Sequence, residues 1–182
     1  MRIIRGKYGH RRFTVPPTFK ARPTTDMAKE NIFNVLENLI DWEETRALDL
    51  FAGTGSIGLE MVSRGCPYVV GVELDPQHAD FIKKVVALLH EEDYHLVRGD
   101  ALKYIATASS SDSFDLIFAD PPYALPELQS LPDRILSGSL LATDGLLVLE
   151  HPRDYSFQDH PNFDQERKYG SVHFSLFRHH SE

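Results

Sequence analysis

The segment Asp120-Pro121-Pro122-Tyr123 has the residue types needed to hold an aromatic amine in place for reaction. Such an amine is a poor nucleophile because its lone pair is delocalised into the ring, so a catalyst must bind both N–H groups and orient the nitrogen. The Asp120 carboxylate and the Pro121 carbonyl are suitable acceptors. Two successive prolines fix φ and lack an N–H, which makes the loop stiff and keeps the acceptors aimed.

Tyr123 completes this predicted clamp, because its ring face can stack against an extruded or single-stranded nucleobase. Stacking of this kind is worth about 1–3 kcal/mol per base at comparable sites. We therefore expect the catalytic residues to be Asp120, Pro121, Pro122 and Tyr123. The alternative is an ordinary turn after the apolar strand predicted at 114–119.

A second motif, the glycine loop at 52–58, follows a predicted strand at 47–51 and precedes a predicted helix. Its glycines, Gly53, Gly55 and Gly58, have the dinucleotide-binding spacing, and Glu73 stands about twenty residues on, where a ribose-binding acid belongs. This fingerprint alone fits a nicotinamide cofactor as well as S-adenosylmethionine.

Other features favour the methyl donor. Asp49, near the end of the first strand, can meet the ammonium group of S-adenosylmethionine but would repel a pyrophosphate. Dehydrogenases usually carry a substantial substrate domain, yet only residues 124–182 follow Tyr123. Asp100 could contact the adenine, and it could equally cap a helix at 101–106. The expected cofactor-binding residues are Asp49, Phe51, Ala52, Gly53, Thr54, Gly55, Gly58, Glu73, Leu74, Asp100 and Ala101.

Alternating strands and helices must position these motifs. A helix is expected from Thr24 or Thr25, with apolar residues at helical spacing, and another from Asp75-Pro76. An apolar strand is predicted at 146–149 and a hairpin at 163–178. The pattern predicts an α/β protein with a mostly parallel sheet, helices on both faces and an antiparallel C-terminal hairpin. Glu150 could then lie near the bound base, although a structural hydrogen-bonding role is the alternative for it and for His151.

The charge of the chain is concentrated at its start. Residues 1–22 carry seven basic and no acidic side chains, a charge of +7, so the net charge of −8 leaves −15 for the remainder. A cationic segment can neutralise phosphates while the acidic body stays soluble. Alternation around Gly6 and Gly9 suggests a small basic β-hairpin rather than a tail without a partner. The expected RNA-binding residues are Arg2, Arg5, Lys7, Arg11, Arg12 and Arg22.

Composition narrows the remaining possibilities. Length predicts one catalytic domain at 23–182 with an extension at 1–22. Cys66 is the single cysteine, and the nine histidines show no ligand spacing, so neither a disulfide nor a metal site is expected. No apolar run approaches the ~18 residues of a membrane span and no signal peptide is evident, which predicts a cytoplasmic protein.

These motifs together resemble the bacterial small-subunit rRNA guanine-N2 methyltransferase family, which consists of Rossmann-like class I enzymes. Besides the glycine loop and the clamp, the resemblance rests on segments at 2–7, 22–26, 32–34, 58–60 and 63–65. It departs at Arg5, where relatives usually have glycine, and in the modified turn at 9–12. The resemblance implies a seven-stranded sheet and places residues 22–25 over the cofactor pocket.

By the same resemblance, the chain transfers a methyl group from S-adenosylmethionine to the exocyclic N2 of one guanine in 16S rRNA. The expected partner is 16S rRNA or the assembling 30S subunit, and the expected state is a monomer. Three alternatives remain: a DNA adenine-N6 or cytosine-N4 methyltransferase, a nicotinamide oxidoreductase and a nonenzymatic RNA-binding module. The short segment after Tyr123 disfavours the first alternative, since DNA enzymes usually need a sizeable target-recognition region.

Overall fold

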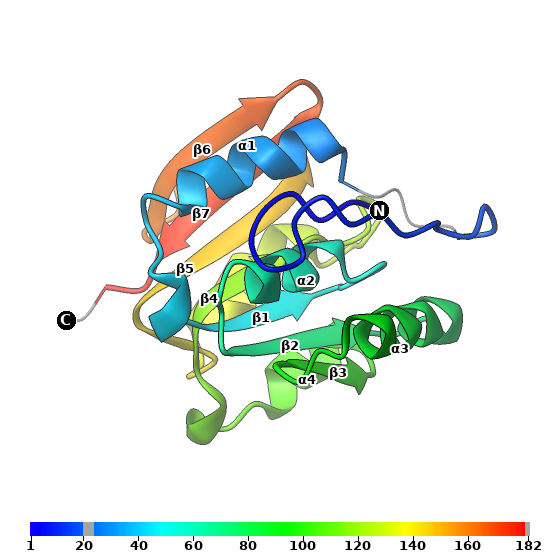
Figure 1. Cartoon of the computed structure of the whole chain (residues 1–182). Helices are drawn as coiled ribbons and strands as arrows, with labels where there is room; N and C mark the ends of the chain where they lie inside the picture. The colour runs from blue at the N-terminus through cyan, green and yellow to red at the C-terminus, as the bar shows by residue number, and fades with distance from the viewer. Residues whose placement is uncertain (20–23, 181–182) are drawn as a thin grey trace.

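A single seven-stranded sheet forms the centre of the computed structural model, which describes residues 1–19 and 24–180 (Figure 1). Its spatial order is β3-β2-β1-β4-β5-β7-β6, with β7 antiparallel to β5 and β6 and the other pairs parallel. The expected mostly parallel sheet with a C-terminal hairpin is confirmed. The strands are β1 (Arg46–Leu50), β2 (Tyr68–Glu73), β3 (Tyr94–Arg98), β4 (Phe114–Ala119), β5 (Leu141–Pro152), β6 (Phe163–Tyr169) and β7 (Val172–Arg178).

Helices cover both faces of this sheet, as expected. Successive residues of each strand contact opposite faces, so Ala47 packs with the cluster beneath α1, α2 and α3, while Leu48 packs with the cluster beneath α4 and α5. None of the helices among the described residues is long and apolar enough to cross a membrane. The helices are α1 (Asp26–Leu36), α2 (Ser56–Ser63), α3 (Pro76–Leu89), α4 (Ala101–Thr107) and α5 (Leu131–Leu136), with short 3-10 turns η1 (Trp42–Glu44), η2 (Ser110–Asp112) and η3 (Leu128–Ser130).

Side-chain caps start three of these helices at the predicted places. The Thr25 hydroxyl accepts a hydrogen bond from Ala28 N at 3.2 Å and starts α1. Asp75 accepts from two amides at the start of α3, and Asp100 does the same for α4. Each cap satisfies amides that have no partner within the helix. The cap role of Asp100 is thus observed.

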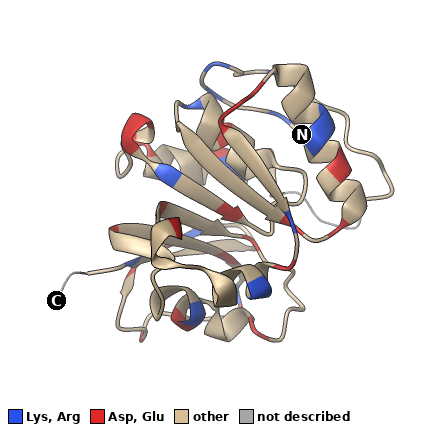
Figure 2. Ribbon diagram, turned by 90° about the horizontal axis from the view of Figure 1, so that it is seen from below, with Lys and Arg blue, Asp and Glu red and all other residues tan. Residues whose placement is uncertain are grey.

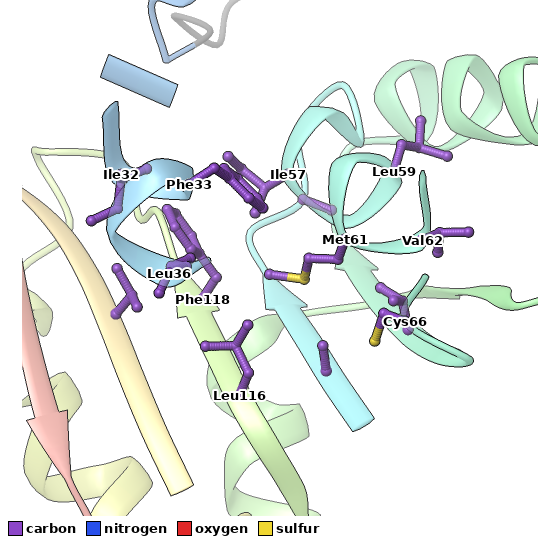
Figure 3. Packing of buried hydrophobic residues seen from close by; sticks show 14 of the residues in the cluster. Ile32, Phe33, Leu36, Ile57, Leu59, Met61, Val62, Cys66, Leu116 and Phe118 are labelled. Atoms are coloured by element: carbon purple, nitrogen blue, oxygen red, sulfur yellow. The ribbon is translucent and has the colours of Figure 1, made fainter. Parts of the chain in front are cut away.

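The core beneath α1 and α2 is apolar and tightly interlocked (Figure 3). Phe33 of α1 is fully buried and stacks on Trp42, with ring centroids 5.8 Å apart. Ile57 and Met61 of α2 belong to the same apolar cluster as Phe33 and as Phe118 of β4 (Figure 3). This packing fixes α2, and therefore the glycine loop before it, against the sheet.

The N-terminal segment folds back on itself and lies beside α2 (Figure 1). It forms the expected hairpin shape, but its only ladder among the described residues is one antiparallel bridge between Arg2 and Arg12. Ile3 is fully buried in the main core, so the segment is packed onto the rest of the fold. Gly6 has φ +87°, and a Cβ there would lie 1.7 Å from the Ser63 carbonyl oxygen, so only glycine fits this close approach.

A buried ionic cluster fastens this segment to α1 and α2. Both Glu60 carboxylate oxygens accept backbone amides, from Ile4 at 2.7 Å and from Arg5 at 3.1 Å. The fully buried Lys29 ammonium lies 3.2 Å from Glu60, and Arg64 Nε lies 3.0 Å from its other oxygen. Burial lowers the pKa of Lys29, and the Glu60 charge opposes that shift. The cluster therefore depends on every partner being present.

Candidate active site

The carboxyl ends of five neighbouring strands each present an acidic side chain at one edge of the sheet. Strand register brings the ends together, since Leu50 of β1 pairs with Val72 of β2 and with Ala119 of β4. In open α/β sheets this edge is where ligands bind. The acids, taken across β3, β2, β1, β4 and β5, are Asp100, Glu73, Asp49, Asp120 and Glu150.

The glycine loop turns sharply between β1 and α2. Phe51 and Gly53 have φ of +61° and +58°, and Gly55 ends the loop at +80° as the N-cap of α2. A Cβ at Gly53 would meet nothing within 4 Å, so open space adjoins the backbone there. A Cβ at Gly58, in contrast, would lie 2.6 Å from the Tyr94 ring. The loop thus leaves room for a ligand at its first glycine and packs tightly at its last.

Asp49 lies buried beneath this loop and accepts a hydrogen bond from Gly58 N at 3.1 Å. Burial raises the pKa of Asp49 to about 8; the Gly58 hydrogen bond opposes that rise and the Glu73 charge adds to it. A positively charged ligand group would favour the ionised carboxylate. The site therefore fits the ammonium group of S-adenosylmethionine.

Tyr94 reaches the same place from β3 and was missed in the sequence. Its hydroxyl is buried and has no hydrogen-bond partner among the described residues. Burial raises its pKa well above the usual value, and the nearby Asp49 and Glu73 charges add to the rise. A Cβ at Gly71 would lie 1.9 Å from this hydroxyl oxygen. Glycine inside the β2 strand was the available signal, because it often marks a close approach by another group.

Glu73 holds the glycine loop from the end of β2. Its Oε2 accepts Gly53 N at 2.6 Å and its Oε1 accepts Asp75 N at 3.0 Å. Each carboxylate oxygen can accept a further hydrogen bond, so binding a ribose hydroxyl remains compatible with these contacts. Leu74, next along the chain, is 63 % exposed. Ala52, Thr54 and Ala101 are buried around this edge.

The predicted clamp lies at the end of β4, immediately beside β5. The Thr24 hydroxyl lies 3.3 Å from Asp120 Oδ2 and 3.0 Å from Glu150 Oε1, so this threonine contacts both acids. Pro122 O accepts Leu125 N at 2.9 Å, whereas no hydrogen bond among the described residues reaches Pro121 O. Tyr123 is 43 % exposed. Within the predicted clamp, Pro121 is therefore buried and Tyr123 is exposed.

Burial strongly raises the pKa of Asp120, and the hydrogen bond and charge of Glu150 raise it further. The Asp49 charge also adds to this rise, while the Thr24 hydroxyl opposes it. His151, next to Glu150, instead bonds Ser175 Oγ at 2.8 Å on β7, which is a structural contact. A structural hydrogen bond was the alternative predicted for both residues; His151 forms one with Ser175, whereas Glu150 accepts the Thr24 hydroxyl beside Asp120.

The basic residues of the N-terminal segment fall into two groups. Arg2 pairs with Asp26 at 3.2 Å, and Lys7 pairs with Glu91 at 2.8 Å. Arg5, Arg11 and Arg12 are exposed, and none of them forms an ion pair with a described residue. Figure 2 shows basic and acidic residues scattered over the remaining ribbon. Arg22 lies outside the described residues. No group of three metal-ligating side chains occurs within residues 1–19 and 24–180.

Asp49→Asn provides a test of the cofactor end of the site. In the wild type, affinity for S-adenosylhomocysteine should rise from pH 6 to 8. Below about pH 8 Asp49 holds a proton, which must be lost before the carboxylate can pair with the ammonium group of the ligand. The variant should bind more weakly, with affinity independent of pH over that range. Calorimetry measures both, with exposed Asp159→Asn as the control.

The same substitution has a stability signature. A carboxyl whose folded pKa is raised stabilises the fold below its unfolded pKa of about 4, and that stability is lost as pH rises through the folded value. Wild-type melting temperature should therefore fall relative to Asp49→Asn between about pH 4 and pH 8. Parallel melting curves across this range would contradict the raised pKa.

Several known proteins are similar to this chain in sequence and in structure, and some of them are named as methyltransferases. A family model described as "Conserved hypothetical protein 95" matches residues 1–178. "Ribosomal RNA small subunit methyltransferase D" of Buchnera aphidicola is 28% identical over 97% of this chain and 91% of its own. The solved Escherichia coli protein yhhF, provisionally named a methyltransferase, has a TM-score of 0.85 and 27% identity over 100% and 99% of the two chains. An RNA methyltransferase of Salinibacter ruber, solved with S-adenosyl-L-homocysteine, shares the fold at a TM-score of 0.69 and 14% identity. The match covers 88% of this chain and 95% of that protein.

Proposed function

The chain belongs to the family described as Conserved hypothetical protein 95, and from that premise we propose that it is an S-adenosylmethionine-dependent rRNA methyltransferase. Its target is the exocyclic N2 of one guanine in 16S rRNA, in the cytoplasm, during assembly of the small subunit. The observation that carries the proposal is the adjacency of two sites. The clamp acid Asp120 follows β4, whose neighbour β1 carries Asp49 beneath the glycine loop.

The cofactor supplies an activated methyl group on a sulfonium. Asp49 and Glu73 bind its ammonium and ribose groups, and the open backbone at Gly53 admits it. Asp120 and the Pro121 carbonyl accept the two N–H groups of the guanine amine, and Tyr123 stacks on the ring. The protein therefore contributes mainly orientation and exclusion of water, since the amine needs no covalent intermediate to attack.

The exposed arginines of the N-terminal segment bind the RNA backbone. Arg11 and Arg12 extend from a segment whose position is fixed by the Glu60 contacts, so they present charge at a defined distance from the clamp. Arg2 and Lys7, which already pair with acids, contribute less. Phosphate contacts position an RNA without reading its sequence.

Replacing both Arg11 and Arg12 with alanine should weaken RNA binding and flatten its dependence on salt. Each lost phosphate contact removes roughly one unit from the slope of log K against log salt. Filter binding of 16S rRNA fragments across a salt series measures this slope. Arg167 and Lys168, exposed on the edge strand β6, provide a control pair with the same change in charge. An unchanged slope in the Arg11/Arg12 variant would remove these residues from the RNA interface.

The reaction itself is tested by mass spectrometry of nucleosides. Ribosomal RNA and DNA from cells lacking the gene are digested and compared with those from the parent strain. Loss of one N2-methylguanosine from 16S rRNA, restored by the wild-type gene, is the expected result. Loss of a methyladenine or methylcytosine from DNA would instead support the rival DNA methyltransferase.

A further inference from the structure

Two acidic side chains share one small space at the clamp. Asp120 follows β4 directly, and Glu150 lies one residue beyond Leu149 of β5, which pairs with Ala119. The Thr24 hydroxyl lies within hydrogen-bond distance of both, at 3.3 and 3.0 Å. A hydroxyl has one hydrogen to donate, so it can satisfy only one of the two carboxyls at a time.

No described positive charge compensates the pair. Neither acid forms an ion pair with a described residue, and the ionisable group that faces them from β1 is another acid, Asp49. On the β5 and β7 side, His151 bonds Ser175, and His173 bonds Glu166 of β6 at 3.0 Å. A second carboxyl so close, in a poorly solvated place, favours a retained proton, in agreement with the raised pKa of Asp120. One retained proton between them satisfies the geometry.

We propose that Glu150 is a positioning residue for Asp120: the two carboxyls share one proton, and Thr24 holds them in register beneath the base amine. The inference rests on the proposed function and deepens it. Because the proton is shared, the Asp120 oxygen that faces the amine stays a hydrogen-bond acceptor. Glu150 also prevents the Asp120 side chain from rotating toward solvent or toward Asp49. The pair then acts as a single acceptor of fixed direction.

The same pair can receive the proton that the reaction releases. The amine nitrogen forms a bond to the methyl carbon, the carbon–sulfur bond breaks, and its electron pair returns to sulfur. The methylated nitrogen then loses one N–H proton, whose bonding pair stays on nitrogen. That proton passes to the ionised oxygen of the Asp120–Glu150 pair, which becomes doubly protonated until it exchanges with solvent.

Glu150→Gln tests the shared proton without any substrate. Gln keeps the shape but cannot ionise, so the variant has one carboxyl where the wild type has two. Stability tied to a raised folded pKa is present below the unfolded value near 4 and is lost as pH rises through the folded pKa. The melting temperature of the wild type should therefore fall relative to Glu150→Gln from pH 5 to 9. Glu44→Gln, on an exposed turn, should show no such trend.

Kinetics tests the positioning role. Single-turnover methylation of 16S rRNA by Glu150→Gln should slow on the order of tenfold to a hundredfold, with a changed pH profile and unchanged S-adenosylhomocysteine binding. Thr24→Val should slow the reaction in the same direction, and Thr24→Ser, which keeps the hydroxyl, should restore it. A purely structural threonine would not separate these two variants by rate at equal stability.

Two results would overturn the inference. One is a melting difference between wild type and Glu150→Gln that stays constant from pH 5 to 9. The other is a wild-type rate and pH profile in Glu150→Gln. If the wild-type protein methylates no RNA, the proposed function fails, and the melting series alone then decides whether the two carboxyls share a proton.

Discussion

Replacing Asp120 with alanine should abolish methyl incorporation into 16S rRNA while leaving S-adenosylhomocysteine binding unchanged. In the proposed mechanism the carboxylate is one of two acceptors that orient the amine, and misplacement of a reacting atom by about 1 Å can cost on the order of a hundredfold in rate. Removal of the acceptor altogether should cost more. Asp49 and Glu73, the proposed cofactor-binding residues, lie on other strands, so the affinity measured by calorimetry should be retained.

Asp154→Ala is the matched control, because this acid is exposed in the loop after β5. It should methylate at the wild-type rate. Circular dichroism and melting curves check that the Asp120 variant folds. Since the Asp120 pKa is raised by burial and by Glu150, its removal should not destabilise the protein at neutral pH. Retained turnover in a folded Asp120→Ala variant would exclude the carboxylate from the mechanism.

Of the substitutions proposed for this protein, Glu60→Ala should lower the free energy of unfolding the most. It leaves the Lys29 ammonium buried without its 3.2 Å partner and removes the acceptor of the Ile4 and Arg5 amides. Breaking a buried ion pair from one side typically costs about 3–5 kcal/mol. For a chain of this size that corresponds to roughly 6–20 °C in melting temperature. Denaturant unfolding and thermal melting measure the loss.

The position of the N-terminal segment supplies a second readout for the same variant. The amides of Ile4 and Arg5 should exchange hydrogen much faster in Glu60→Ala, because the carboxylate oxygens that accept them are gone. Glu43→Ala, an exposed acid of η1, is the control and should change neither stability nor exchange. Unchanged protection of the Ile4 and Arg5 amides in the Glu60 variant would show that other contacts hold the segment.

Local rules predicted much of the fold and part of the site. Thr25, Asp75 and Asp100 cap helices because a cap depends on residues only two or three positions away. The alternation of strands and helices along the chain likewise predicted the parallel sheet. The junctions between strands and the loops that follow them placed Asp49, Glu73 and Asp120 at one edge of that sheet. Parallel strands separated by helices end on the same side, so this part of the site follows from order along the chain.

Contacts between distant segments were beyond such rules. Thr24 meets Glu150 across 126 positions, and Ile4 meets Glu60 across 56. Only the folded chain shows which acids these groups reach. Charge counting had the same limit: Arg2 and Lys7 carry positive charge, yet partners on α1 and near the end of α3 engage them. A count of basic residues therefore overstates the charge available to RNA.

The row of acids along five strand ends has a consequence for what may enter. A phosphodiester approaching these strand ends meets an acidic side chain at each of them and is repelled wherever the carboxyl is ionised, whereas an uncharged heterocycle with an NH2 is not repelled. We therefore expect a nucleic acid to insert a single nucleobase between these strand ends while its sugar-phosphate chain stays outside. Free guanosine should accordingly compete with the reaction better than its triphosphate does, a preference opposite to that of a P-loop.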